Sequence, residues 1–396
     1  MLKKIKRLIL YLLLIIFKYH LRIIYFFIKL FTKRKNRVFF LSRQFNEMPL
    51  NYVLLAKELK RNKIEYVSIC KKVPSSVNII VRNEKKKRNV FKQLKNIFGY
   101  YFNIYKQMYY VATSKVIVID GYNIATSLLN HKKETIIIQL WHALAAIKKF
   151  GYQTIGYDGG LNPIVARILC MHKNYDYVIS GSKEMNKYFA EAFNIQERNV
   201  IECGTPTIDY LLKNNEKVVN KLYKKYPQLK KKKNVLYSPT FRTDGRDNNQ
   251  EVIDKFDFEN YNLILTFHPK NKNNIVNKDI ITINRDEFST FDVLRISDYV
   301  ITDYSALAID ACVLNKKLLF YVYDYEKYKK ENGLNIDLYK ELEGNVSDSF
   351  DEIMNIIKNS YNRKSLNSFR KKYISNLKGD STKLITKIIK ENIWKS

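Results

Sequence analysis

The segment from Ile296 to Leu314, ISDYVITDYSALAIDACVL, constrains the fold more than any other part of the chain. Tyr299 to Thr302 is a short β-branched and aromatic run that predicts one buried strand. Ala306 to Leu314 repeats its apolar residues with the period of a helix. A strand that passes through a short turn directly into a helix is typical of α/β domains, so we expect such a domain here.

The turn between this strand and this helix, residues 302–305, is a candidate phosphate site. Ser305 stands where an N-cap is expected, and the start of a helix presents backbone N–H groups and a positive dipole end. Such groups bind phosphate. Asp310 follows among apolar residues, where a carboxylate needs a polar partner or a ligand hydroxyl. A capped core helix with one exposed Asp is the alternative interpretation.

Further strands predict two parallel sheets, and 396 residues exceed one typical core, so two domains are expected. The first predicted set is Val38 to Ser42, Tyr66 to Cys70, Lys115 to Asp120, Thr135 to Leu140 and Tyr177 to Ser180. The second set is Asn234 to Ser238, Tyr261 to Phe267, Ile280 to Ile283, Tyr299 to Thr302 and Lys317 to Tyr323. Helical segments such as Tyr52 to Arg61 alternate with these strands, which is typical of sheets covered on both faces.

The predicted domains follow from the charge runs and the strand sets. Residues 1–36 are expected to form an N-terminal amphipathic membrane segment, and residues 37–228 the first Rossmann-like domain. The boundary is placed at the basic run Leu229 to Lys233, so residues 229–396 form the second domain, ending in a packing helix from Ser381 to Lys395. Neither half carries a GxGxxG motif, which predicts nucleotide binding at strand ends by other loops.

The N-terminal segment is strongly basic, since residues 1–37 contain eleven Lys or Arg and no acid. Its unbroken apolar run, Leu8 to Phe17, has ten residues, whereas a membrane-spanning helix needs about 20. On a helix, one stripe collects the cations Lys4, Arg7, Lys18, Arg22, Lys29 and Lys33, with Tyr11 between them. The pattern predicts a helix in the membrane interface, with its apolar side in the acyl boundary and its cations at anionic headgroups.

A cleaved signal peptide and a tilted transmembrane helix are the alternatives for this segment, although no small-residue cleavage site follows it. The four cysteines lie far apart in apolar contexts, which predicts buried thiols in a reducing compartment. Together these features predict a peripheral protein on the cytoplasmic side of the cell membrane. The net charge of +32 favours anionic partners, although joint abundance of Lys, Asn, Ile and Tyr also reflects the base composition of a genome.

Two of the five histidines directly follow predicted strands. His142 follows TIIIQLW and His268 follows NLILTF, so both are expected at the carboxyl edge of a sheet, one in each domain, facing the same cleft. An imidazole there can take a proton from an attacking hydroxyl or stabilise charge on a phosphate. A buried structural histidine is the alternative for either. For His20, His131 and His172, structural or surface roles are expected.

Two more turns follow strands and carry hydroxyl groups or a cation. They are residues 204–206, GTP, and residues 238–242, SPTFR, where the Arg242 guanidinium is suited to grip phosphate bidentately. The sequence has no Walker loop, no HExxH and no GxSxG motif, and no DxD-like pair lies near these turns. No obligate metal and no cofactor are therefore predicted.

At these residues the chain resembles the CDP-glycerol glycerophosphotransferase family, the teichoic-acid primases and polymerases that act at the inner face of bacterial membranes. The similar segments are QLWHALAAIKKFG (139–151), CGTPTIDYL (203–211), VLYSPTFR (235–242), FHP (267–269) and SDYVITDYSALAID (297–310). The resemblance implies an α/β, GT-B-like fold of two facing Rossmann-type domains. It makes residues 37–228 the acceptor domain and residues 229–396 the CDP-alditol-binding domain.

The resemblance also implies a catalytic pair, with His142 as the base toward the acceptor hydroxyl and His268 assisting charge at the donor phosphate. The acceptor hydroxyl would attack the β-phosphate of a CDP-alditol, and CMP would leave. The implied substrate-binding residues are Trp141, Ala143, Pro239, Thr240, Arg242, Thr266, Phe267, Ser305, Ala306 and Asp310.

The chain departs from the family's pattern at three places. The family usually has Gly-Thr at residues 143–144, Arg where Thr207 stands and a second Ser where Ala306 stands. Lys148 or Lys149 is expected to replace the missing cation. Because phosphate and hydroxyl donors are lost at these positions, the identity of the donor stays open.

The implied partners are CDP-glycerol or CDP-ribitol, a lipid-linked (polyprenyl diphosphate) glycan acceptor and an anionic membrane surface, with no nucleic acid. Glycerol or ribitol, and primase or polymerase, stay open. A sugar-nucleotide glycosyltransferase of the same GT-B fold is the nearest alternative. A non-catalytic membrane or nucleic-acid binder is a second alternative, but the basic residues outside the N-terminal segment do not cluster with aromatics as in nucleic-acid modules.

Overall fold

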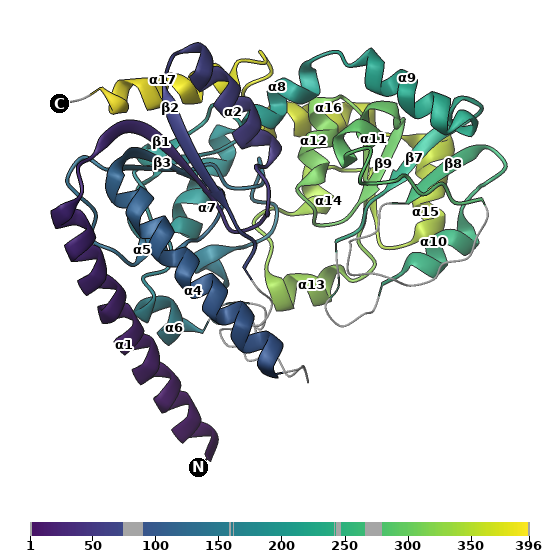
Figure 1. The fold of residues 1–396 in the computed structure, drawn as a ribbon. Coiled ribbons are helices and arrows are strands. Elements are labelled where there is room, and N and C mark those ends of the chain that lie inside the picture. Colours follow the sequence, from purple (N-terminus) through teal and green to yellow (C-terminus); the bar gives the residue numbers. More distant parts are fainter. Residues whose placement is uncertain are drawn as a thin grey trace. The chain divides into compact units, whose positions relative to one another are not determined.

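The structure is a computed structural model that describes residues 2–73, 90–157, 160, 162–240, 242, 247–265 and 279–394. The chain forms two compact units. Unit 1 comprises residues 1–142, 149–207 and 380–396, and unit 2 comprises residues 143–148 and 208–379. Each unit contains one sheet with helices around it (Figure 1). All strand pairs in both sheets are parallel, so the predicted α/β class with two parallel sheets is confirmed.

The sheet of unit 1 has the strand order β2-β1-β3-β4-β5-β6. Its strands are β1 (Lys35–Ser42), β2 (Glu65–Cys70), β3 (Ser114–Ile119), β4 (Ile136–Gln139), β5 (Tyr177–Ile179) and β6 (Val200–Ile201). Its helices are α1 (Leu2–Phe31), α2 (Leu50–Arg61), α4 (Val90–Thr113), α5 (Ile124–Ser127), η1 (Gly151–Thr154), α6 (Pro163–Ile168), α7 (Lys183–Phe193), η2 (Glu197–Asn199) and α17 (Ser381–Ile393).

Successive strand residues face opposite layers of helices in unit 1. Val38 and Phe40 of β1 belong to a core with α2 and α17, whereas the ring of Phe39 packs against Tyr110 of α4 at 5.5 Å. Because both faces are covered, the strands are apolar at nearly every position, and this explains why their sequences are continuous hydrophobic runs. Helix α2 follows Pro49 and ends with Lys60 and Arg61, as expected for a helix with a basic last turn.

The sheet of unit 2 has the strand order β11-β10-β9-β7-β8. Its strands are β7 (Lys233–Tyr237), β8 (Tyr261–Leu265), β9 (Tyr299–Thr302), β10 (Lys317–Tyr321) and β11 (Val346–Ser347). Its helices are α9 (Glu216–Lys225), η3 (Pro227–Lys230), α10 (Asn249–Lys255), α11 (Thr290–Ile296), α12 (Leu307–Val313), α13 (Tyr325–Asn332), α14 (Leu338–Glu341), α15 (Phe350–Asn355), η4 (Ile356–Ser360) and α16 (Arg363–Tyr373). Helix α8 (Pro206–Leu212) carries the chain from one unit into the other.

The predicted strand at Ile280 to Ile283 is wrong. Ile281 makes a single bridge to Ile264 and no ladder. Ile281 and Ile283 are nevertheless buried, at 7% and 4% exposure. An apolar segment can therefore be buried while only one of its residues pairs with the sheet, and a hydrophobic run alone does not distinguish such a segment from a strand. Strands β6 and β11, with two residues each, were not predicted.

The chain passes from unit 1 to unit 2 at residues 207–208, earlier than the predicted boundary at residues 228–229. The units differ from the predicted domains in two further places. Helix α17 packs in unit 1, where Ile385, Ile389 and Ile393 are fully buried, and not on the second half of the chain. Residues 143–148 belong to unit 2, because Lys148 bridges Leu334 and the Ile147 carbonyl accepts a bond from a backbone N–H at residue 335, at 2.9 Å. Sequence periodicity does not reveal such returns of the chain.

Each sheet has one topological switch point, where successive strands are added on opposite sides of the first strand. In unit 1 this point lies between β1 and β3, and in unit 2 between β7 and β9. In open α/β sheets, ligands bind outside the carboxyl ends of the strands at such points. The loops after these four strands are therefore where a site is expected.

Candidate active site

The loop after β4 holds His142 in unit 1. Trp141, directly before it, has a left-handed backbone with φ of 56°, which is strained for a bulky residue. The Trp141 N–H donates to Oε1 of Gln139 at 2.9 Å, and its ring stacks on Phe150 with centroids 4.8 Å apart. Packing and this hydrogen bond together fix the backbone that presents His142.

The geometry of His142 defines which ring nitrogen is basic. Its Nδ1 lies 3.2 Å from the carbonyl oxygen of Asp120, and its ring lies 4.0 Å from the Trp141 ring. A carbonyl oxygen only accepts hydrogen bonds, so Nδ1 carries the hydrogen and Nε2 is the basic nitrogen of the neutral ring. Since the side chain is exposed, this arrangement suits a general base.

Asp120 is a site residue that the sequence reasoning missed. It follows β3 directly, and its Oδ2 accepts a hydrogen bond from Ser42 Oγ at 2.6 Å. The residue is 4% exposed, and burial raises the pKa of its carboxyl to about 6, although the bond from Ser42 acts in the opposite direction. The signal was present in the sequence, because VIVID places an Asp after an apolar strand just as VITD does at Asp303.

In unit 2 the loops after β7 and β9 are joined by hydrogen bonds. Thr240 donates to Asp303 Oδ1 twice, from its N–H at 2.9 Å and from its hydroxyl at 2.6 Å. The N–H of Tyr304 also donates to that oxygen, at 2.7 Å. Thr240, which follows Pro239, thus lies beside the turn that leads to Ser305, and the phosphate-binding role of these residues stays a prediction.

Arg242 is not arranged as predicted. Its guanidinium binds both carboxylate oxygens of Asp324, at 2.8 and 3.0 Å, and the Thr240 carbonyl at 2.9 Å. It also pairs with Asp303 at 3.0 Å, and Tyr328 stacks 3.7 Å from Tyr304 beside it. The predicted bidentate grip on phosphate is therefore corrected, because these protein groups use the donors that it needs.

Ser305 and Asp310 lie at and near the start of α12. Ser305 Oγ accepts from the Leu307 N–H at 3.3 Å, but the N-cap is Ala306, one residue later than predicted, and the helix has only seven residues. Its apolar surroundings raise the pKa of Asp310 to about 7. Within the described parts of the chain, its carboxylate makes no hydrogen bond or ion pair, so a polar ligand is a suitable partner for it.

The structure separates the two candidate replacement cations. Lys149 belongs to unit 1, where its Nζ donates to the Tyr157 hydroxyl at 3.1 Å. Lys148 is exposed and belongs to unit 2, where Asp303 and Arg242 are its charged neighbours. Among the residues described, that ammonium group has no hydrogen bond or ion pair. Of the two, only Lys148 lies in the unit that carries the loops after β7 and β9.

Several predicted positions carry structural contacts or lie outside the description. Thr207, which stands where the family usually has Arg, bonds Asn51 Oδ1 through its N–H and its hydroxyl, at 2.8 and 2.7 Å. Ala143 is half-buried in unit 2. Thr266, Phe267 and His268 lie outside the described residues, so their predicted roles stay predictions.

The remaining histidines contact protein groups in unit 1. His20 bonds the Tyr105 hydroxyl at 2.9 Å, and His131 bonds the Tyr25 hydroxyl at 3.0 Å. His172 is buried, and desolvation lowers its pKa to about 3. These contacts agree with the structural roles expected for all three. Within the ranges described, no three His, Cys, Asp or Glu side chains gather as metal ligands do.

Two doubly wound parallel units, each with polar loops at its switch point, define the GT-B-like class of transferase folds. The wall teichoic acid polymerase TagF has this fold, with a TM-score of 0.67 and 20% identity over 91% of this chain and 90% of that one.

The chain matches the family described as CDP-Glycerol:Poly(glycerophosphate) glycerophosphotransferase over residues 23–391, and it belongs to that family. It is accordingly a transferase of the CDP-glycerol glycerophosphotransferase type, as the sequence resemblance predicted. It is 29% identical to the teichoic acid ribitol-phosphate primase of Bacillus spizizenii over 305 residues, 74% of this chain and 78% of the relative. It is 31% identical to the teichoic acid glycerol-phosphate primase of Bacillus subtilis over 300 residues, 74% and 77% of the two chains.

Proposed function

We propose that this protein transfers glycerol phosphate or ribitol phosphate from a CDP-alditol to a lipid-linked glycan acceptor, releasing CMP, in teichoic-acid-like or capsule polymer synthesis. Family membership supports the reaction class. The observation that carries the proposal is the His142 ring, whose Nδ1 is held by the Asp120 carbonyl at 3.2 Å. This contact leaves Nε2 as the basic nitrogen, as a base for a hydroxyl nucleophile requires.

The proposed reaction is a displacement at the alditol-bearing phosphorus. His142 Nε2 takes the proton of the acceptor hydroxyl while that oxygen forms a bond to phosphorus. The bond from phosphorus to the bridging oxygen breaks, and CMP leaves with the electron pair. Positioning and charge stabilisation supply most of the catalysis in phosphoryl transfer.

The donor is proposed to bind at the β7 and β9 loops of unit 2. Thr240 and Ser305 supply hydroxyl groups there, Lys148 supplies positive charge, and the Asp310 carboxylate accepts a bond from an alditol or ribose hydroxyl. Arg242 holds the two loops together through Asp324 and Asp303 rather than binding phosphate. His268 keeps its proposed role at the donor phosphate.

The first expected result is acceptor-dependent release of CMP. The purified protein in detergent is incubated with CDP-glycerol and CDP-ribitol in turn, with and without an undecaprenyl diphosphate-linked glycan. We expect CMP from one of the two donors only when the acceptor is present. If neither donor yields CMP with an acceptor that a control enzyme can use, the result would contradict the proposed function.

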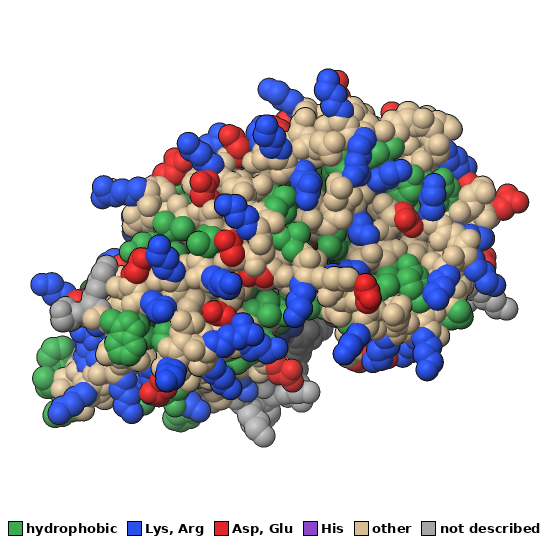
Figure 2. All heavy atoms as spheres, turned by 90° about the horizontal axis from the view of Figure 1, so that it is seen from above, with side chains coloured by type: hydrophobic (Ala, Val, Ile, Leu, Met, Phe, Trp, Pro, Cys, Tyr) green, Lys and Arg blue, Asp and Glu red, His purple; other side chains and the backbone are tan. Residues whose placement is uncertain are grey.

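A glycosyltransferase acting on a sugar nucleotide is the second candidate. One observation favours it. Thr207, which stands where the family usually has Arg, donates two hydrogen bonds to Asn51 and supplies no positive charge to a donor phosphate. A glycosyl transfer releases a nucleoside diphosphate, so the released nucleotide distinguishes the two reactions. Nucleic-acid binding has less support, since Figure 2 shows Lys and Arg scattered with Asp and Glu over the face it presents rather than in one stripe.

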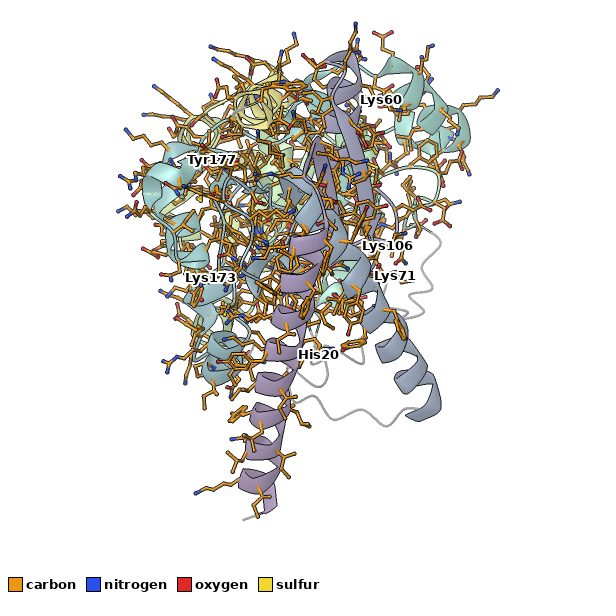
Figure 3. All side chains as sticks on the ribbon, turned by 60° about the vertical axis from the view of Figure 1, so that its left-hand side comes forward. His20, Lys60, Lys71, Lys106, Lys173 and Tyr177 are labelled. Carbon is orange, nitrogen blue, oxygen red and sulfur yellow. The ribbon has the colours of Figure 1, made fainter. Side chains whose placement is uncertain are left out.

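Helix α1 supports attachment to a membrane through its apolar face, as predicted, although part of its cation stripe contacts the protein. It is the one helix in the described chain with the length and apolarity to cross a membrane. Figure 3 shows α1 next to α4 around His20, with its N-terminal part extending away. Leu21 and Tyr25 are buried against unit 1, so the helix is docked along its second half.

Part of the predicted cation stripe faces the protein. Arg22 donates to the Leu128 carbonyl at 3.0 Å and Lys29 to the Asn130 carbonyl at 2.6 Å. The prediction that the whole stripe meets headgroups is therefore corrected; Lys4, Arg7 and Lys33 remain exposed. The opposite face is apolar and exposed over Ile5, Leu8, Ile9, Leu12, Leu13, Ile15, Ile16, Tyr19, Ile23, Phe26, Phe27, Leu30 and Phe31.

We propose that this exposed face of α1 enters the acyl boundary of the cytoplasmic leaflet. Leu12 and Ile23 are 52% and 58% exposed on it, so Leu12→Glu with Ile23→Glu should reduce binding to phosphatidylglycerol-containing vesicles at least about tenfold. Arg22→Gln with Lys29→Gln is the matched control, expected to keep vesicle binding but lower the melting temperature. Sedimentation at 0.1 and 1 M salt measures both. Full loss of wild-type binding at 1 M salt would show that charge, not the apolar face, holds the protein.

A further inference from the structure

Asp120 occupies the switch point of the unit 1 sheet. Asp120 is the first residue after β3. Strand β1 lies between β2 and β3 in the sheet, so the chain goes from β1 to one side to form β2 and then to the other side to form β3. The loops after β1 and β3 therefore form the crevice where open α/β sheets bind ligands. A buried carboxylate there requires an explanation.

The contacts of Asp120 leave one carboxylate oxygen unsatisfied. Ser42 Oγ donates to Oδ2 at 2.6 Å, and the same hydroxyl accepts from the Gln44 N–H at 3.2 Å. Oδ1 is buried and has no hydrogen-bond partner in the described structure. Burying a charged oxygen without a partner costs folding free energy, so such groups are retained where they serve a function.

The groups around Asp120 do not neutralise it. Burial, followed by the Asp120 charge, raises the pKa of the Cys70 thiol at the end of β2 to about 11. The Tyr52 hydroxyl of α2 is also close enough for the Asp120 charge to raise its pKa, after the larger effect of burial. Arg43 attracts the carboxylate weakly, but its guanidinium donates to the Tyr122 carbonyl at 2.7 Å. Above about pH 6 the site therefore holds a buried negative charge.

Unit 2 contains the same construction with one difference. Asp303 also follows its switch-point strand and also accepts from a hydroxyl on the neighbouring loop, Thr240, at 2.6 Å. Asp303, however, pairs with Arg242 at 3.0 Å. In the described part of unit 1, Asp120 has no such ion pair, and the ring that its own carbonyl contacts is His142.

We propose that Asp120 is a positioning residue for His142: its carbonyl sets the orientation and tautomer of the imidazole, and its carboxylate stabilises the imidazolium that forms during transfer. This inference rests on the proposed function of His142 as the base. When Nε2 takes the acceptor proton, the ring becomes a cation, and the residue whose backbone carbonyl it contacts carries the buried carboxylate. The coupling is electrostatic and includes no proton transfer to Asp120, as for the buried Asp of serine-protease triads.

The buried charge of Asp120 lowers the stability of the folded protein above its pKa. Because the pKa of Asp120 is raised in the folded protein, to about 6, its ionisation costs folding free energy at pH above 6. That cost disappears as the pH falls from 6 toward 4. Asp120→Asn removes the charge and keeps an oxygen for Ser42, so we expect a melting temperature at pH 8 no lower than that of the wild type. Loss of activity without loss of stability is typical of a functional residue.

Two measurements test the proposal. In the CMP assay, Asp120→Asn is expected to lower kcat about 10- to 100-fold, to change the KM for donor less than twofold, and to move the acid limb of the kcat profile to lower pH. Independently of activity, an NMR pH titration of the protein with labelled histidine measures the titration midpoint of each imidazole. The chain has five histidines, and the signal that is missing in His142→Gln belongs to His142. The His142 midpoint is expected to fall by at least half a pH unit in Asp120→Asn.

Asp176→Asn is the matched control, because Asp176 is another desolvated carboxylate of unit 1 whose Oδ2 accepts from the Ile137 N–H at 2.8 Å. It should leave the His142 titration unchanged. An unchanged midpoint in Asp120→Asn, or equal shifts in both variants, would overturn the role of Asp120. A wild type that shows the expected coupling in NMR but releases no CMP would instead contradict the proposed function.

Discussion

Replacing His142 by Ala should lower the turnover number for CMP release by about 10²- to 10⁴-fold, the range that a general base contributes. The substitution removes Nε2, the basic nitrogen that the Asp120 carbonyl defines by binding Nδ1. The KM for donor should change little, because the donor is proposed to bind through unit 2. Initial rates at saturating acceptor, measured over a range of CDP-alditol concentrations, give both parameters.

Two controls separate this loss from damage to the fold. His142 is exposed, so the far-UV circular dichroism and melting temperature of His142→Ala should match those of the wild type. His20→Ala is the matched histidine substitution: His20 bonds Tyr105 on α4, and its loss should leave kcat within about twofold in detergent. A His142→Ala protein with full turnover would remove this residue from the mechanism.

The parts of the fold that the sequence predicts are those with local signals. Buried strands such as β3 and β9 consist mostly of β-branched residues, and both appear within a residue of their predicted bounds. The sheet order, the return of α17 to unit 1 and the transfer of residues 143–148 to unit 2 depend on contacts between distant segments. Periodicity within a segment contains no information about these contacts.

In the candidate site, too, features with a local signal were predictable and contacts between distant segments were not. The position of His142 after a strand was predictable, because the strand is visible in the sequence. The partner of its Nδ1 was not, since it depends on β3 pairing with β4. The sequence does not reveal the carboxylate partners of Arg242, because these partners, including Asp324, lie up to 82 residues away in the sequence. Guanidinium groups bind carboxylate and phosphate with the same geometry, so the sequence alone does not distinguish them.

This reassignment of Arg242 leaves the donor phosphates without their predicted cation, and Lys148 is the residue that we expect to supply it. Lys148 lies in unit 2, held by its bridge to Leu334, with Asp303 and Arg242 as charged neighbours. Those two pair with each other, and an ammonium group beside a neutralised pair is suited to bind an incoming anion. A hydrogen bond to a charged group contributes about 1.5–3 kcal/mol, or roughly 10- to 150-fold in kcat/KM.

Lys148→Ala is therefore expected to lower kcat/KM for the CDP-alditol by about 10- to 150-fold, mainly through KM, and Lys148→Arg should restore most of it. Lys149→Ala is the matched control, because the adjacent lysine bonds Tyr157 in unit 1 and should change kcat/KM less than threefold. Inhibition by CDP distinguishes binding from chemistry, since the inhibition constant should rise in Lys148→Ala alone. Equal losses of kcat/KM in Lys148→Ala and Lys149→Ala would mean that both lysines act only through their positive charge. Lys148 would then make no specific contact with the donor phosphate.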